Sequence, residues 1–138
     1  MRKKILATIL CICIITGAIG VPVAQANLSD NAATPTRWTN CSTISLAINL
    51  KNGTMTSEGQ IIGKQGTTRI SVTFTLEKLV NGKYTYVDSW PASSNSMLCS
   101  SIRQTTGCTS GTYKLSVAGT VTKDNYAEPI EDWLIKTF

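Results

Sequence analysis

The fold of this chain is decided by the stretch Ile70-Ser71-Val72-Thr73-Phe74-Thr75-Leu76-Glu77. Large apolar side chains occupy every second position of it, and small or polar side chains lie between them. Because successive side chains of a strand point to opposite faces, this pattern predicts a strand with one buried face. The β-branched and aromatic composition favours the same structure.

Similar segments flank this one on both sides. They cover residues 44–50, about 55–62, about 85–90, about 97–104, 113–121 and, with a poorer pattern, 130–136. Turn-forming residues separate them, the clearest being Asn81-Gly82, which tolerates the positive φ angles of a tight hairpin. Residues 91–95 are expected to form a polar loop, and Gly59 predicts either a bulge or close packing within its strand.

About seven short strands, and no convincing amphipathic helix after the N-terminal region, predict an all-β fold. We expect a single antiparallel β-sandwich, immunoglobulin-like in the loose sense, over residues 37–138. The pentapeptide Gly111-Thr112-Tyr113-Lys114-Leu115 resembles the entry to the sixth strand of immunoglobulin-type domains, where a tyrosine hydroxyl bonds to the backbone of the corner. A tyrosine that merely takes its place on an alternating strand is the other interpretation.

The N-terminal residues have the pattern of a cleaved secretory signal peptide. Arg2-Lys3-Lys4 precede an apolar run over residues 5–23, and Ala24-Gln25-Ala26 forms a small-x-small cleavage site. Cleavage after Ala26 leaves a polar arm, residues 27–36, that we expect to be flexible. The chain is therefore predicted to be secreted and extracellular, with no attachment to the membrane after cleavage.

Charge and composition exclude several classes of function. Removal of three N-terminal cations lowers the formal net charge from +5 to about +2, and no basic run remains to follow a phosphate backbone. The chain has no histidine, so the most frequent general base and the usual partner of a nucleophilic serine or cysteine are missing. We expect neither nucleic-acid binding nor enzymatic activity.

Several acidic residues lie close together in the sequence, as the carboxylate pair of a glycoside hydrolase would. Glu77 with Asp88 is one such set, and Glu128, Glu131 and Asp132 form another. A chain with this many acids produces such neighbours by chance, so we predict no catalytic residue, no metal site and no cofactor.

Three cysteines follow the predicted signal peptide: Cys41, Cys99 and Cys108. In an up-and-down sandwich, Cys41 and Cys99 lie at the same end and Cys108 at the other. A disulfide requires the two Cα atoms to lie within about 7 Å, so the topology predicts Cys41–Cys99 if oxidation occurs. Cys99–Cys108 requires the segment between them to loop back, and three reduced thiols are the remaining alternative.

The aromatic residues after Asn81-Gly82 are the most function-like feature of the chain. A two-residue turn pairs Thr73 with Trp90 and places Tyr84, Tyr86 and Trp90 on the outer face, as an aromatic strip able to stack on sugar rings. A three-residue loop with a bulge shifts the pairing by one residue and turns Tyr84 and Tyr86 inward. Ordinary core or rim aromatics are therefore the alternative to a binding strip.

The chain after the signal resembles a family of small exported proteins from Gram-positive bacteria that is catalogued as a domain of unknown function. The resemblance is carried by short motifs: Arg37-Trp38, Gly53, Gly59, Leu76-Glu77-Lys78, the pattern Gly-x-aromatic…Val-x-x-Trp from Gly82 to Trp90, Gly111-Thr112-Tyr113 and Glu128. Tyr84 stands where a tryptophan is expected, and Tyr113 stands alone where a run of aromatics is usual. The resemblance implies export and a β fold, favours the shifted hairpin register, and implies no activity.

These observations together predict a secreted, non-enzymatic binding module. Its expected partners are cell-wall polysaccharide, another glycan or an extracellular protein. A secreted antagonist, such as a bacteriocin-like toxin or an inhibitor, would use the same kind of scaffold and is the alternative.

Overall fold

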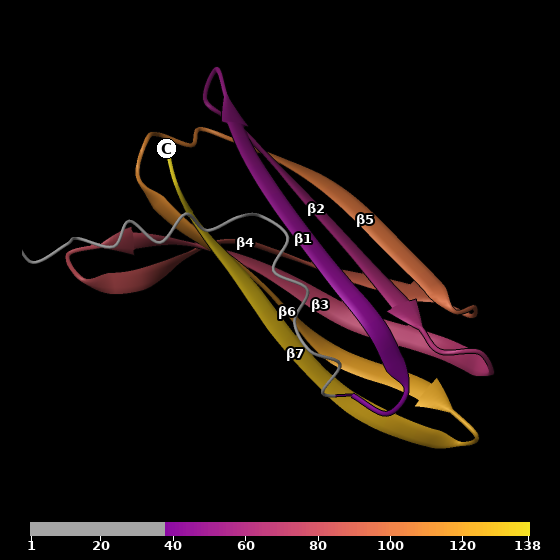
Figure 1. The fold of residues 1–138 in the computed structure, drawn as a ribbon. Helices are drawn as coiled ribbons and strands as arrows, with labels where there is room; N and C mark the ends of the chain where they lie inside the picture. The colour runs from indigo at the N-terminus through magenta and orange to yellow at the C-terminus, as the bar shows by residue number, and fades with distance from the viewer. Residues whose placement is uncertain (1–37) are drawn as a thin grey trace, which may run out of the picture.

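A computed structural model describes residues 38–138, which form two antiparallel sheets packed face to face (Figure 1). The strands are β1 (Cys41–Lys51), β2 (Thr54–Gly63), β3 (Thr67–Val80), β4 (Lys83–Ser94), β5 (Leu98–Thr106), β6 (Thr112–Lys123) and β7 (Tyr126–Thr137). The predicted all-β sandwich of seven strands is confirmed. The predicted signal peptide and the arm at residues 27–36 lie outside the described residues. Between residues 38 and 138 there is no helix long and apolar enough to cross a membrane.

The two sheets differ in size and exchange strands along the chain. One has three strands in the order β1-β2-β5, and the other has four in the order β4-β3-β6-β7. The chain therefore crosses from one layer to the other after β2, after β4 and again after β5. Strands β1, β5, β4 and β7 are the four edges of the sandwich.

Three tight turns join neighbouring strands within a sheet. In the predicted hairpin, Asn81 and Gly82 have φ angles of 50° and 77°, and positive φ at both central residues is the mark of a type I′ turn. Asn52-Gly53 and Asp124-Asn125 have the same signs. The Asn81-Gly82 hairpin is thus confirmed, and its twist matches that of the strands it joins.

Two strand boundaries, the end of β4 and the start of β7, differ most from those predicted. The polar loop expected at residues 91–95 is wrong for most of its length, because β4 continues through Pro91 to Ser94. β4 is an edge strand, where a proline, which has no N–H to donate, can lie beside its single partner strand without leaving a ladder bond unmade. Pro129 is accommodated in the same way in β7, which begins at Tyr126 rather than near residue 130.

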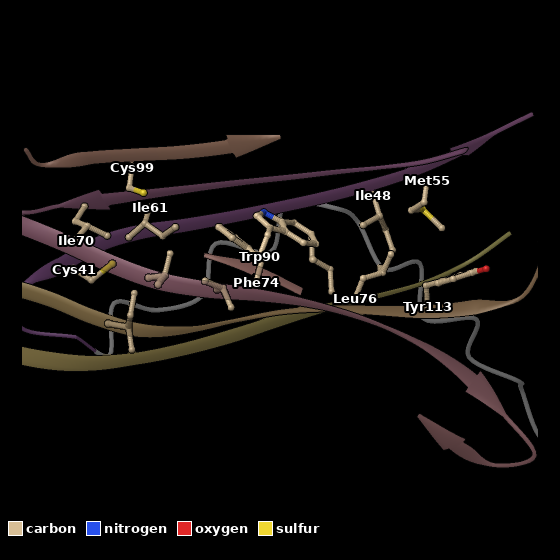
Figure 2. Packing of buried hydrophobic residues seen from close by; sticks show 14 of the residues in the cluster. Cys41, Ile48, Met55, Ile61, Ile70, Phe74, Leu76, Trp90, Cys99 and Tyr113 are labelled. Carbon is tan, nitrogen blue, oxygen red and sulfur yellow. The ribbon is translucent and has the colours of Figure 1, made fainter. Parts of the chain in front are cut away.

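The core fills the space between the inner faces of the two sheets (Figure 2). The alternating residues Ile70, Val72, Phe74 and Leu76 all face it, as the opening stretch of sequence predicts. Gly59 of β2 lies directly against them: a Cβ atom there would fall 2.1 Å from Cε1 of Phe74. The pairing of β2 is regular at this point, so Gly59 marks close packing and not a bulge.

Candidate functional site

The register of the β3–β4 hairpin decides which aromatic residues are available to a ligand. Next to the turn, Leu79 pairs with Tyr84 and Glu77 with Tyr86, which is the two-residue register. The pairing then shifts between Leu76 and Glu77, so that Leu76 lies opposite Asp88 and Val87 is the extra residue of a bulge. The shifted register that the family resemblance favours is therefore wrong near the turn. Beyond the bulge neither alternative holds, because the pairing has moved by one residue in the direction opposite to the one expected.

The bulge removes Trp90 from the predicted strip. Beyond it, Trp90 pairs with Phe74 instead of Thr73, so its side chain points inward. Its ring stacks on that of Phe74 with the centroids 5.5 Å apart, and 7% of the residue is exposed (Figure 2). The indole N–H donates to Oγ of Ser101 in the opposite sheet at 3.0 Å. The three-residue strip Tyr84, Tyr86 and Trp90 is thus wrong in its third member, because one extra residue in a strand reverses the faces that follow.

Tyr84 and Tyr86 do lie on the outer face of the four-stranded sheet, with 37% and 65% of their surface exposed. Across this sheet, Tyr86 pairs with Glu77, Glu77 with Lys114, and Lys114 with Ile135. In the adjacent row, Ser89 lies opposite Thr75, Thr75 opposite Ser116, and Ser116 opposite Trp133 of β7. Trp133, 51% exposed, therefore shares the outer face with the two tyrosines.

We call Tyr84, Tyr86 and Trp133, with the side chains between them, the ring face. Three strand spacings separate β4 from β7, which puts Trp133 about 14 Å across the sheet from the tyrosines. In the row that ends at Trp133, the other side chains are the small hydroxyl residues Ser89, Thr75 and Ser116. The row of Tyr86 continues with Glu77 and Lys114, so the surface between the rings is polar.

Charged groups hold the tyrosine end of the ring face in place. Nζ of Lys114 lies 3.5 Å from Oε2 of Glu77 and 5.4 Å above the ring centroid of Tyr84. A cation at that distance from an aromatic face is attracted to it. The lysine thus restrains the ring of Tyr84 and leaves Tyr86, the more exposed of the two, to meet a ligand.

Between residues 38 and 138 the acidic residues are not gathered into one site. Glu77 faces outward, whereas Asp88 pairs with Leu76 and faces inward, so the two carboxylates lie on opposite faces of the sheet. Oδ2 of Asp88 accepts hydrogen bonds from Nε of Arg103 at 3.0 Å and from Thr105 at 2.9 Å, which closes the side of the sandwich between β4 and β5. Burial alone would raise the pKa of Asp88, but these bonds outweigh it and lower the pKa.

Glu128 closes the opposite side of the sandwich, between β1 and β7. Its carboxylate accepts hydrogen bonds from the backbone N–H groups of Thr39 and Asn40, each at 2.6 Å, and from that of Cys41 at 3.3 Å. Burial by itself would raise the pKa of Glu128, yet the three N–H donors hold it below its ordinary value. We call Glu128 and the segment Thr39–Cys41 the N-terminal clasp, since it attaches the start of the domain to its last strand.

The predicted Cys41–Cys99 disulfide is not present, because Cys41, Cys99 and Cys108 are all free thiols. The prediction placed two of them correctly: Cys41 pairs with Gly63, and Cys99 with Ile61, so both lie at the same end of β2. However, β1 and β5 flank β2 on its two sides, and alternate strands lie about 9.6 Å apart, beyond disulfide reach. Burial raises the pKa of the Cys41 thiol to about 11.

Tyr113 forms the corner that the sixth-strand motif predicts. Its hydroxyl donates to the backbone carbonyl of Thr109 at 2.8 Å, four residues earlier in the chain, while its ring is 1% exposed. This hydrogen bond confirms the interpretation of Tyr113 as a corner residue. The alternative, a tyrosine that merely takes its place on an alternating strand, is wrong. Tyr113 therefore belongs to the core and is not part of the ring face.

A hollow lies on the outer face of the three-stranded sheet. It is lined by Ser45, Ala47, Glu58, Gly59, Gln60, Ser100, Ser101 and Ile102. It contains one carboxylate and no aromatic ring. Within residues 38–138 no group of three or more acidic or cysteine side chains is arranged to hold a metal ion. The ring face is therefore the surface whose chemistry points most clearly to a ligand.

The class of protein that this geometry defines is a two-sheet β-sandwich with a flat aromatic outer face. In comparisons with known proteins, no family model, curated protein or solved structure matches the chain.

Proposed function

We propose that this protein is a secreted, non-enzymatic module that binds an extended polysaccharide on its ring face. The observation that carries the proposal is the exposure of Tyr86 and Trp133 on one face of one sheet. A polysaccharide presents rings with apolar faces and hydroxyl rims, and the ring face offers aromatic faces with hydroxyl side chains between them. Tyrosine and tryptophan are enriched at binding interfaces because each combines a large apolar ring with a polar group.

The spacing of the rings favours a chain of sugars over a single sugar. The distance of about 14 Å between the tyrosines and Trp133 is too long for one sugar ring to cover. An extended glycan can touch both ends, with the small residues Thr75 and Ser116 beneath it. Cell-wall polysaccharide is the ligand class that also agrees with the proposed export of the protein.

The proposals that the protein is exported and that it is related to a known family rest on the sequence. The N-terminal signal-peptide pattern and the resemblance to small exported proteins of Gram-positive bacteria support a secreted protein. The corner formed by Tyr113 supports an immunoglobulin-like sandwich. In constant-type immunoglobulin domains the fourth strand belongs to the sheet of the first, second and fifth, whereas here β4 pairs with β3, so the likeness we propose is a loose one.

Binding to insoluble glycans tests the proposal. We expect residues 27–138 to pellet with peptidoglycan or with another insoluble polysaccharide, and Tyr86→Ala and Trp133→Ala each to weaken binding about five- to tenfold, because each removes one stacking ring. Both side chains are largely exposed, so neither change should unfold the protein. The measurement is the fraction of protein pelleted as a function of polysaccharide concentration.

Tyr126→Ala is the matched control. Tyr126 is 59% exposed, similar to the two ring-face residues, but it lies at the β6–β7 turn. We expect this variant to bind like the unmodified protein. Equal binding by all four proteins, or failure to bind any polysaccharide in the panel, would contradict the ring face as a glycan site.

A further inference from the structure

The four edges of the sandwich are protected to very different degrees. β4 and β7 contain Pro91 and Pro129, and a proline in an edge strand discourages pairing with another chain. β1 has a bulge between Cys41 and Thr43, and its Ile48 carbonyl accepts a hydrogen bond from Lys136 of β7 at 3.3 Å. Each of these three edges therefore has a feature that blocks or disturbs the addition of a further strand.

β5 has none of these features. It contains no proline or glycine, and it pairs with β2 in an unbroken register along its whole length. Its one charged residue is Arg103, whose guanidinium turns toward Asp88 of β4. An edge with a regular register presents the backbone groups that point away from its partner strand to any strand that approaches it. At Leu98, the first residue of β5, the backbone N–H and C=O already hydrogen-bond to the hydroxyl of Ser96.

Two apolar side chains of β5, those of Leu98 and Ile102, are exposed beside this edge. Ile102 is 71% exposed and Leu98 is 47% exposed, and both point to the outer face of the three-stranded sheet. Ile102 is also the middle residue of the nine-residue strand Leu98–Thr106. A two-fold axis through Ile102 would therefore pair the complete strand with a second copy of itself.

We propose that this protein forms a symmetric dimer in which β5 pairs with β5 of a second copy in antiparallel orientation, centred on Ile102. In this register Ile102 meets its own copy, Leu98 meets Thr106 and Arg103 meets Ser101, so no two like charges lie opposite each other. Such a two-fold contact is self-complementary, which is the usual form of a homodimer interface. The two three-stranded sheets become one continuous sheet.

The dimer leaves the proposed glycan site accessible. The ring face belongs to the outer side of the four-stranded sheet, whereas β5 is an edge of the other sheet. Two ring faces on one dimer would bind an insoluble polymer more tightly than one, because the second contact becomes intramolecular. The dimer itself does not depend on the glycan proposal.

The molecular mass of residues 27–138 in solution tests the dimer. By sedimentation velocity over a range of concentrations we expect twice the monomer mass, and we expect Ile102→Lys to raise the dissociation constant about tenfold or more, since two lysines would then face each other at the axis. Tyr126→Lys introduces the same charge at a similarly exposed aromatic residue and should leave the dimer intact. A monomer at all concentrations would overturn the proposal.

Cysteine cross-linking tests the register independently of affinity. In Ile102→Cys the two new thiols face each other across the axis, so mild oxidation should give a covalent dimer. In Ser100→Cys they are separated by about 14 Å along the strands, because each lies opposite Gln104 of the other copy. The native thiols are buried and should not interfere. Equal cross-linking of the two variants would show that the copies do not pair in this way.

Discussion

Replacement of Trp90 by alanine is expected to lower the free energy of unfolding by about 3–5 kcal/mol, the usual cost of deleting a large aromatic side chain from a core. Trp90 stacks on Phe74 and donates to Ser101 of the opposite sheet, so its loss leaves a cavity and removes a bond between the two layers. Chemical denaturation of residues 27–138 measures this change. The result also decides whether the bulge at Val87 turns the ring inward.

Tyr86→Ala is the control for this prediction, since Tyr86 precedes Trp90 by only four residues on the same strand but lies outside. We expect its effect on stability to stay within about 0.5 kcal/mol. If both variants were equally stable, Trp90 would be a surface residue and the hairpin would lack its bulge. Because Trp90→Ala disturbs the core, it is unsuitable as a test of ligand binding.

Removal of the Glu128 carboxylate is expected to open the N-terminal clasp. A hydrogen bond to a charged group contributes about 1.5–3 kcal/mol, and Glu128 accepts two short bonds and one longer bond from Thr39, Asn40 and Cys41. We therefore expect Glu128→Ala to lower the free energy of unfolding by about 3 kcal/mol. Hydrogen exchange should show faster exchange of these three amides, while those in the centre of β3 and β6 stay protected.

Lowering the pH should reduce the free energy of unfolding of the unmodified protein, because it protonates the same carboxylate. Because the pKa of Glu128 is lower in the folded chain than in the unfolded chain, the carboxylate stabilises the fold above the unfolded value of about 4.3. That contribution disappears as the pH falls through the folded-state value. Asp88, whose pKa is also lowered, adds to the loss in the same direction.

The variant Glu128→Gln separates the contribution of Glu128 to the pH dependence of stability from that of Asp88. We expect the stability difference between the unmodified protein and this variant to be greatest at neutral pH and to shrink as the pH falls to about 3, as the linkage between protonation and folding requires. Glu58→Gln, at an exposed carboxylate on the outer face of β2, is the matched control and should leave the stability at neutral pH unchanged. A difference that stayed constant with pH would show that the charge of Glu128 does not stabilise the clasp.

Some of the ring face was recognisable from the sequence and some was not. The Asn81-Gly82 turn predicts the pairs nearest to it, so the outward direction of Tyr84 and Tyr86 follows from two residues. Trp133 was missed because its segment lacks clear alternation: its inner side carries Glu128, Asp132 and Lys136 among the apolar residues. Counting alternate residues forward along β7 from the Asp124-Asn125 turn would have placed Trp133 on the outer face.

The seven strands, their tight turns and the single core could be predicted from the residues alone, because alternation and turn chemistry are local properties of each segment. Three features follow only from the folded molecule: Trp90 is buried, β2 separates Cys41 from Cys99, and Glu128 binds the start of the domain. Each of these depends on contacts between residues distant in the chain. A bulge of one residue, or the choice of a neighbouring strand, is settled by how side chains of two sheets fill one shared space, and no single segment encodes that.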